Sequence, residues 1–154
     1  GHDPWHDVTM AVDGEAARAL GDLARGRWCM ANGWRPNAPP TYTDGWPAAM
    51  EPTMRDVDVA IARTQPAYDA LPEVREIEAL YLDAIASARR SIYMESQYFA
   101  AHRIGEALER RLAEPHGPEV VVINPARAQG WLEEQAMGAA RALLVERLRA
   151  ADRY

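Results

Sequence analysis

The residues best suited to chemistry stand at the end of residues 90–99, a stretch with the composition of a β-strand. It is rich in β-branched and aromatic residues and contains neither Gly nor Pro. Its first half is apolar, and its second half adds the carboxylate of Glu95 and the amide of Gln97. Ligands of open α/β sheets bind beyond the carboxyl ends of the strands. We therefore interpret Glu95, Gln97 and Tyr98 as the edge of a binding pocket; a partly exposed strand with ordinary polar residues is the alternative.

Two more predicted strands end in polar side chains. Alternating residues 56–63 end at Arg63, and the apolar run 120–123 is followed by Asn124. If all three strands are parallel, Arg63, Gln97 and Asn124 lie at one edge of the sheet. A guanidinium group holds a phosphate through a fork of donors, and amides add neutral donors. This pattern favours an anion-binding edge, although strand ends are also polar because they meet solvent.

These side chains need a scaffold, which the hydrophobic periodicity predicts. Apolar residues alternate or run continuously in some segments and recur with helical spacing in others. A continuous apolar run such as residues 120–123 is typical of a parallel strand buried on both faces. The order of elements predicts an α/β fold with a largely parallel sheet and covering helices. We expect strands near 8–12, 56–63, 91–98 and 119–124, and helices near 15–30, 73–90, 103–114 and 130–150.

Composition restricts the class of protein. The chain has 154 residues, 48% of them hydrophobic, which is typical of a soluble globular protein with a core. No apolar run is long enough for a transmembrane helix. The net charge of −6 argues against non-specific nucleic-acid binding. Cys29 is the only cysteine, so neither a disulfide nor a zinc site is expected, and no metal or cofactor is predicted.

His6 is followed directly by the carboxylate of Asp7. A carboxylate can orient an imidazole as a general base. Neighbours on a strand point to opposite faces, however, so a structural role for the pair is the alternative.

Two segments of the chain resemble the phospholipase D superfamily. Residues 92–99, I-Y-M-E-S-Q-Y-F, are similar to the segment I-Y-I-E-N-Q-Y-F just inside the second half of those enzymes. Residues 4–8, P-W-H-D-V, followed by V-D-G-E-A-A at 12–17 and R-W at 27–28, resemble the end of the first half. The order and separation of the segments agree with the family. The resemblance implies that residues 1–31 end the first half, 32–53 form a Pro-rich linker loop and 54–154 begin the second half.

The family performs its chemistry with two copies of H-x-K-x-x-x-x-D, and this chain contains no lysine. The resemblance therefore implies an interior segment of a phosphodiesterase or phosphatidyltransferase that is inactive alone. The Ala- and Arg-rich composition without lysine indicates a bacterial source. In such enzymes one His attacks phosphorus and forms a phosphohistidine. By resemblance His6, Asp7, Glu95, Gln97 and Tyr98 border the cleft for a phosphodiester or phospholipid, and none is catalytic.

The same residues leave one alternative function open. In this alternative the chain is a non-enzymatic α/β binding or assembly module that has lost the chemistry. The chain is expected to be soluble, either in the cytoplasm or peripheral to a membrane. Surfaces that faced the missing halves are expected to be apolar and to drive homo-oligomer formation.

Overall fold

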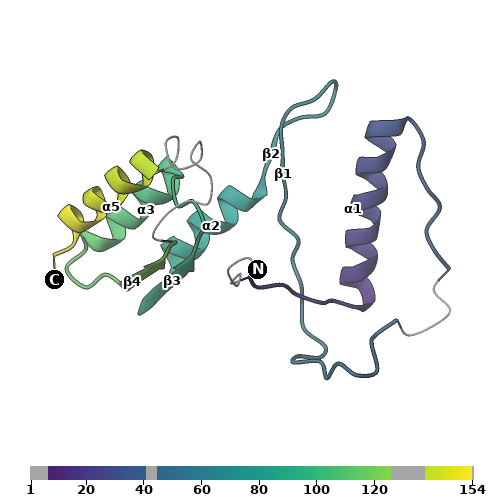
Figure 1. Cartoon of the computed structure of the whole chain (residues 1–154), viewed down its shortest axis with the longest axis horizontal. Coiled ribbons are helices and arrows are strands. Elements are labelled where there is room, and N and C mark those ends of the chain that lie inside the picture. The colour runs from purple at the N-terminus through teal and green to yellow at the C-terminus, as the bar shows by residue number, and fades with distance from the viewer. Residues whose placement is uncertain (1–6, 41–44, 126–137, 154) are drawn as a thin grey trace, which may run out of the picture. The chain divides into compact units, whose positions relative to one another are not determined.

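The computed structural model describes residues 7–40, 45–125 and 138–153 of the chain (Figure 1). The chain divides into two compact units, Gly1–Ile61 and Ala62–Tyr154. Each unit is described by itself below. In the described residues no helix is long and apolar enough to cross a membrane.

The first unit contains α1 (Gly14–Asn32), which confirms the helix predicted for 15–30. The Asp13 side chain caps its start, because Oδ1 accepts the N–H of Gly14 at 2.6 Å. Gly33 ends it in the left-handed conformation, with φ of 75°, and donates its N–H to the carbonyl of Cys29. Both boundaries therefore come from local residue chemistry.

The strand predicted for residues 8–12 is wrong, because this segment has no regular structure. Val8 and Met10 remain 78% and 77% exposed. The strand predicted for 56–63 is also wrong: Val57 is 52% exposed, and Asp56 has a positive φ of 51°. Alternation predicts a strand with one buried face, but no described residue of the first unit is buried. Without a surface to pack against, the pattern forms no strand.

The second unit begins with a short antiparallel pair. β1 (Thr64–Gln65) pairs with β2 (Val74–Arg75) in a two-stranded sheet of its own. α2 (Glu76–Ser87) follows directly, inside the range of 73–90 predicted for a helix. The predicted parallel strand ending at Arg63 is thus absent, and a short antiparallel pair begins directly after that residue.

A parallel pair of strands forms the centre of the second unit (Figure 1). β3 (Ser91–Glu95) and β4 (Glu119–Ile123) confirm two predicted strands, although β3 ends three residues earlier than expected. α3 (His102–Leu112) connects them, and α5 (Ala139–Ala151) packs against α3. The predicted start of the last helix, 130–137, lies outside the described residues.

The helices cover one face of this sheet. Ile92 from β3 is buried with Leu108 of α3, which is fully inaccessible, and with Leu144 of α5. On the opposite face the side chains of Tyr93, Val121 and Ile123 are 64%, 45% and 48% exposed. The prediction that residues 120–123 are buried on both faces is therefore wrong for the described chain. We call Tyr93, Val121 and Ile123 the open face.

Two glycines let chain segments approach closely in the second unit. A Cβ on Gly105 of α3 would lie 2.2 Å from a methyl carbon of Leu144, so its absence lets α3 and α5 pack closely. A Cβ on Gly117 would lie 2.1 Å from the carbonyl oxygen of Arg111. Together these elements establish the general α/β class.

Candidate functional site

The carboxyl ends of β3 and β4 form the candidate site. The N–H of Ser96 continues the ladder by donating to the carbonyl of Ile123 at 3.0 Å. The side-chain amide of Asn124 donates to the carbonyl of Ser96. The carboxyl ends of the two parallel strands therefore lie side by side, as predicted. The residue that bonds to Asn124 is Ser96 and not Gln97.

A tight turn follows β3 and interrupts the predicted strand. The N–H of Phe99 donates to Oγ of Ser96 at 3.1 Å, which closes residues 96–99 into a loop. Phe99 has a positive φ of 42°, a conformation that costs a non-glycine residue roughly 1–3 kcal/mol. Its ring is only 6% exposed and belongs to the hydrophobic core. Burial of the ring and the bond to Ser96 together hold the strained residue.

The turn presents polar side chains to solvent. Gln97 and Tyr98 are the two residues inside the loop, and both are exposed. Their polar groups are an amide and a phenolic hydroxyl, which both donate and accept hydrogen bonds. Their assignment to the edge of a pocket stays a prediction.

Glu95 lies beside the open face rather than on the turn. Its Oε1 accepts a hydrogen bond from the hydroxyl of Tyr93 at 2.6 Å. The same bond raises the pKa of Tyr93, because ionising the phenol would lose the bond and place two negative charges together. Glu95 is therefore held as an acceptor close to the edge.

Arg63 is engaged elsewhere in the second unit. Its Nε and Nη2 donate to the two carboxylate oxygens of Glu76 at 3.0 and 2.8 Å. Its backbone N–H adds a third bond to the same carboxylate at 3.0 Å. This hydrogen bonding lowers the pKa of Glu76 and raises that of Arg63. Because residue 63 belongs to no strand of the β3–β4 sheet, the structure does not join it to Ser96 and Asn124.

The other predicted pair, His6 and Asp7, is only partly described. His6 lies outside the described residues. Asp7 is exposed, and its Oδ1 accepts the N–H of Val8 at 2.8 Å. The described contact is local and gives Asp7 a backbone partner.

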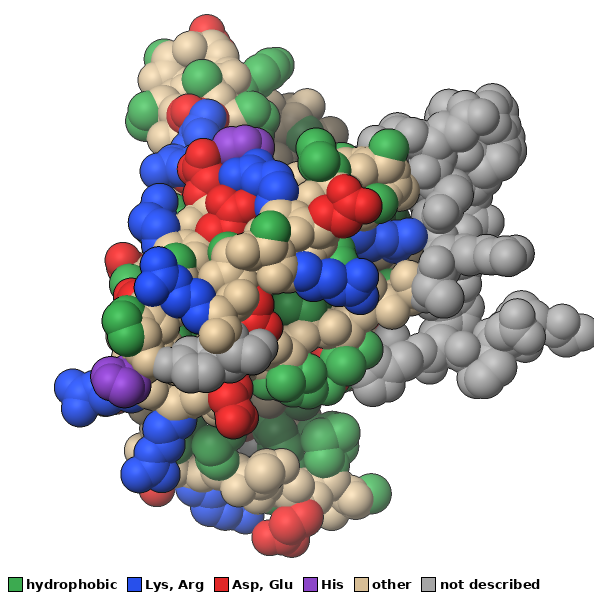
Figure 2. Space-filling view, turned by 90° about the vertical axis from the view of Figure 1, so that its left-hand side faces the viewer, with side chains coloured by type: hydrophobic (Ala, Val, Ile, Leu, Met, Phe, Trp, Pro, Cys, Tyr) green, Lys and Arg blue, Asp and Glu red, His purple; other side chains and the backbone are tan. Residues whose placement is uncertain are grey.

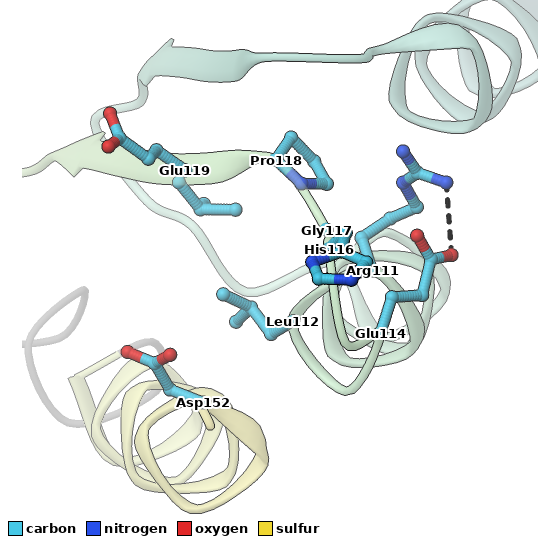
Figure 3. Close-up of a pocket in the computed structure, with 9 residues that line it drawn as sticks. Arg111, Leu112, Glu114, His116, Gly117, Pro118, Glu119 and Asp152 are labelled. Atoms are coloured by element: carbon cyan, nitrogen blue, oxygen red, sulfur yellow. Dashed lines mark hydrogen bonds and ion pairs between the residues drawn. The ribbon is translucent and has the colours of Figure 1, made fainter. Parts of the chain in front are cut away.

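A hollow of about 620 Å³ lies at the opposite, amino edge of β4 (Figure 3). Arg111 and Glu114 form an ion pair of 3.0 Å on one side of it, and the carboxylates of Glu119 and Asp152 lie on others. Nε of Arg111 is buried without a hydrogen-bond partner. No sequence motif joins these residues, because they come from a helix end, a loop, the start of β4 and the end of α5.

The charges of the second unit are largely compensated on the face that Figure 2 displays, where Arg side chains are interspersed with Asp and Glu. Arg147 contacts Glu109 at 2.7 Å, and Arg103 pairs with Glu78. No group of His, Cys, Asp and Glu among the described residues is arranged to hold a metal ion.

Comparison with known proteins adds no relative: the chain matches no family model, no curated protein and no solved structure. The general α/β class therefore rests on the structure alone.

Proposed function

We propose that this chain is an interior segment of a phospholipase D-like phosphodiesterase or phosphatidyltransferase and that its β3–β4 edge borders the substrate cleft. The observation that supports this most is the turn at 96–99. It fixes an exposed amide and hydroxyl at the carboxyl edge of a parallel pair, where α/β proteins bind ligands. The same turn lies in the segment that resembles the family.

Incomplete burial also supports an interior segment. The open face leaves Tyr93, Val121 and Ile123 accessible, whereas parallel sheets are usually covered on both faces. No residue of 7–40 and 45–61 is buried, so the described part of the first unit has no core of its own. Both features agree with a chain whose packing partners belong to a longer polypeptide.

In this proposal the chain alone has no turnover. Phosphodiester cleavage needs a nucleophile, an acid for the leaving group and positive charge on the phosphate. The resemblance places both nucleophile-bearing motifs outside residues 1–154. Glu95, Gln97 and Tyr98 then contact substrate without reacting, and binding alone leaves most of the barrier in place.

The deciding observation is the reading frame around the coding region of this chain. The proposal requires H-x-K-x-x-x-x-D both before residue 1 and after residue 154, and phosphodiesterase activity in the longer protein. A frame without these motifs would favour the alternative, a binding or assembly module. The observation that favours this alternative is the exposed apolar open face.

An activity assay on the chain alone separates the readings further. The purified chain and a His6→Ala variant are incubated with a chromogenic phosphodiester. We expect both to remain at background. Turnover by the wild type that disappears in His6→Ala would contradict the proposal that the chain alone is inactive. It would identify His6 as a catalytic residue.

A further inference from the structure

The outer edge of β4 carries backbone groups that face away from its partner strand. The N–H of Glu119 donates to a residue that flanks β3, and the carbonyl of Ile123 accepts from another, both at 3.0 Å. Successive residues of a strand direct their N–H and C=O groups to opposite sides, so Val120 and Val122 direct theirs away from β3. Among the residues that the structure describes, β3 is the only neighbour of β4 in its sheet. These groups are therefore open to a further strand.

This edge lacks the features that protect an exposed strand from pairing. Proteins commonly protect such edges with charged side chains, with Pro or with a bulge. From Val120 to Ile123, β4 contains only β-branched residues, which favour strands, and its one charge, Glu119, stands at its start. The edge of β3 differs, because it ends in Glu95, whose carboxylate accepts a bond from Tyr93. We therefore expect an added strand at β4 rather than at β3.

We infer that the edge of β4 is an interaction surface for a second copy of this chain, which adds its own β4 in antiparallel orientation. A two-fold axis through the interface, the commonest symmetry of protein dimers, requires two identical strands to pair antiparallel. With the axis at Val121, Val120 of each copy faces Val122 of the other, and the two residues exchange both N–H···O bonds. The copies then share one sheet in the order β3–β4–β4–β3. This pairing goes beyond the proposed function and does not depend on it.

The register centred on Val121 is the one that satisfies the free edge completely. Moving the axis to Val120 would set Val122 against Pro118, which has no N–H to donate. Moving the axis to Val122 would set Val120 against residue 124, beyond the end of β4. The central register therefore uses both free residues within the strand.

Side chains and charges also fit a second copy. The two Val121 side chains would lie next to each other on the open face, and Tyr93, which is paired with Val121 in the register of β3, extends the apolar row on both sides. Antiparallel pairing places the two Glu119 carboxylates about 14 Å apart, at roughly 3.4 Å per residue. Parallel pairing would place them opposite each other, where like charges are destabilising. The open face itself stays exposed, so edge pairing differs from stacking of two open faces.

Disulfide cross-linking of the full chain tests the pairing. Every variant also carries Cys29→Ser, which removes the only native thiol. At a non-hydrogen-bonded antiparallel position the Cα atoms lie about 4.5 Å apart, which a disulfide can span. Val121→Cys should therefore bond to its copy across the axis. Tyr93→Cys is the matched control on the same face, about 14 Å from its copy at roughly 4.8 Å per strand.

A second pair of variants tests the register. In the proposed pairing Ile123 of one copy faces Glu119 of the other. Ile123→Cys and Glu119→Cys should therefore cross-link when mixed, and neither should cross-link well alone. Circular dichroism of each reduced variant checks its folding. If Val121→Cys does not fold, this mixture carries the test.

We expect Val121→Cys to form a covalent dimer under mild oxidation at least fivefold faster than Tyr93→Cys. The mixture of Ile123→Cys and Glu119→Cys should react at least fivefold faster than either variant alone. Stacked open faces hold their sheets about 10 Å apart, too far for a disulfide, and would give no such preference. Equal rates in either comparison, or a wild type that stays monomeric in sedimentation equilibrium, would overturn the pairing. Faster reaction of Tyr93→Cys than of Val121→Cys would assign the association to the edge of β3 and overturn it as well.

Discussion

At the scale of single residues, the fork of bonds between Arg63 and Glu76 is the best-defined polar contact. One guanidinium and one backbone N–H satisfy the same carboxylate, and the Arg63 carbonyl in turn accepts the N–H of Glu76 at 2.9 Å. These bonds tie the segment before β1 to the start of α2. Arg63, predicted to bind an anion, thus has an internal partner in Glu76.

This contact predicts a pH dependence of stability. The pKa of Glu76 in the folded chain is below its ordinary value of 4.5, so the folded chain binds fewer protons than the unfolded chain as pH falls. The stabilisation is complete above pH 4.5 and is lost as pH falls through the lower folded pKa. We expect Glu76→Gln to flatten the acid limb of a plot of unfolding free energy against pH, measured by urea denaturation.

The double variant Arg63→Gln/Glu76→Gln is the control for this prediction. If the pair acts as a unit, adding Arg63→Gln to Glu76→Gln changes the acid limb no further. An acid limb that is as steep in Glu76→Gln as in the wild type would contradict the assignment.

At the scale of elements, the contact of α3 with α5 depends on one missing side chain. A Cβ on Gly105 would meet the buried side chain of Leu144 at 2.2 Å, whereas one on Gly26 of α1 would meet nothing within 4 Å. We expect Gly105→Ala to destabilise the chain by about 1–3 kcal/mol through overpacking. Gly26→Ala is the matched control, expected to favour its helix by roughly 0.5–1 kcal/mol.

Thermal unfolding followed by circular dichroism measures both variants. A second comparison introduces Leu144→Ala into the wild type and into Gly105→Ala. We expect Leu144→Ala to lower the free energy of unfolding less in the Gly105→Ala background, because the new methyl group occupies part of the cavity. Gly105→Ala that behaves like Gly26→Ala would show that α3 and α5 are farther apart than described.

The elements differ in how far they were predictable. Asp13 and Gly33 set the ends of α1 through bonds to their neighbours, so local sequence was sufficient. Residues 8–12 and 56–63 alternate equally well, but a strand needs a partner for its backbone, and alternation does not show whether one exists. At the carboxyl end of β3, Gln97 and Tyr98 are exposed polar residues after an apolar run, and their role in binding stays a prediction. The reversal at Phe99 was not predictable, because it depends on the Ser96 hydroxyl and on burial of the ring.

At the scale of the whole molecule, the hydrophobic core belongs to one unit. Every described buried residue lies in Ala62–Tyr154, and Leu108 is its most inaccessible member. We expect residues 62–154, expressed alone, to unfold cooperatively, and Leu108→Ala to remove about 2–5 kcal/mol of that stability. Non-cooperative unfolding of the shortened chain would contradict a core confined to this unit.

The open face predicts self-association. Tyr93, Val121 and Ile123 form an apolar surface on a two-stranded sheet, and exposed apolar patches tend to find partners. We expect the mass of the chain from light scattering to rise with concentration, and Ile123→Lys to reduce that rise. Leu143→Lys on α5, where Leu143 is 60% exposed, is the matched control. An equal effect of both substitutions would assign the association to another surface.

The parallel pairing of β3 with β4 also determines the order in which the chain can fold. Ser91 pairs with Glu119, and the whole of α3 lies in the connection between them. Parallel strands require such a crossover, and the entropy of closing it is lost before any ladder bond forms. A preformed α3 shortens the flexible part of that connection. We therefore expect the strands to pair late and the nucleus for folding to lie in the helices, where contacts are local.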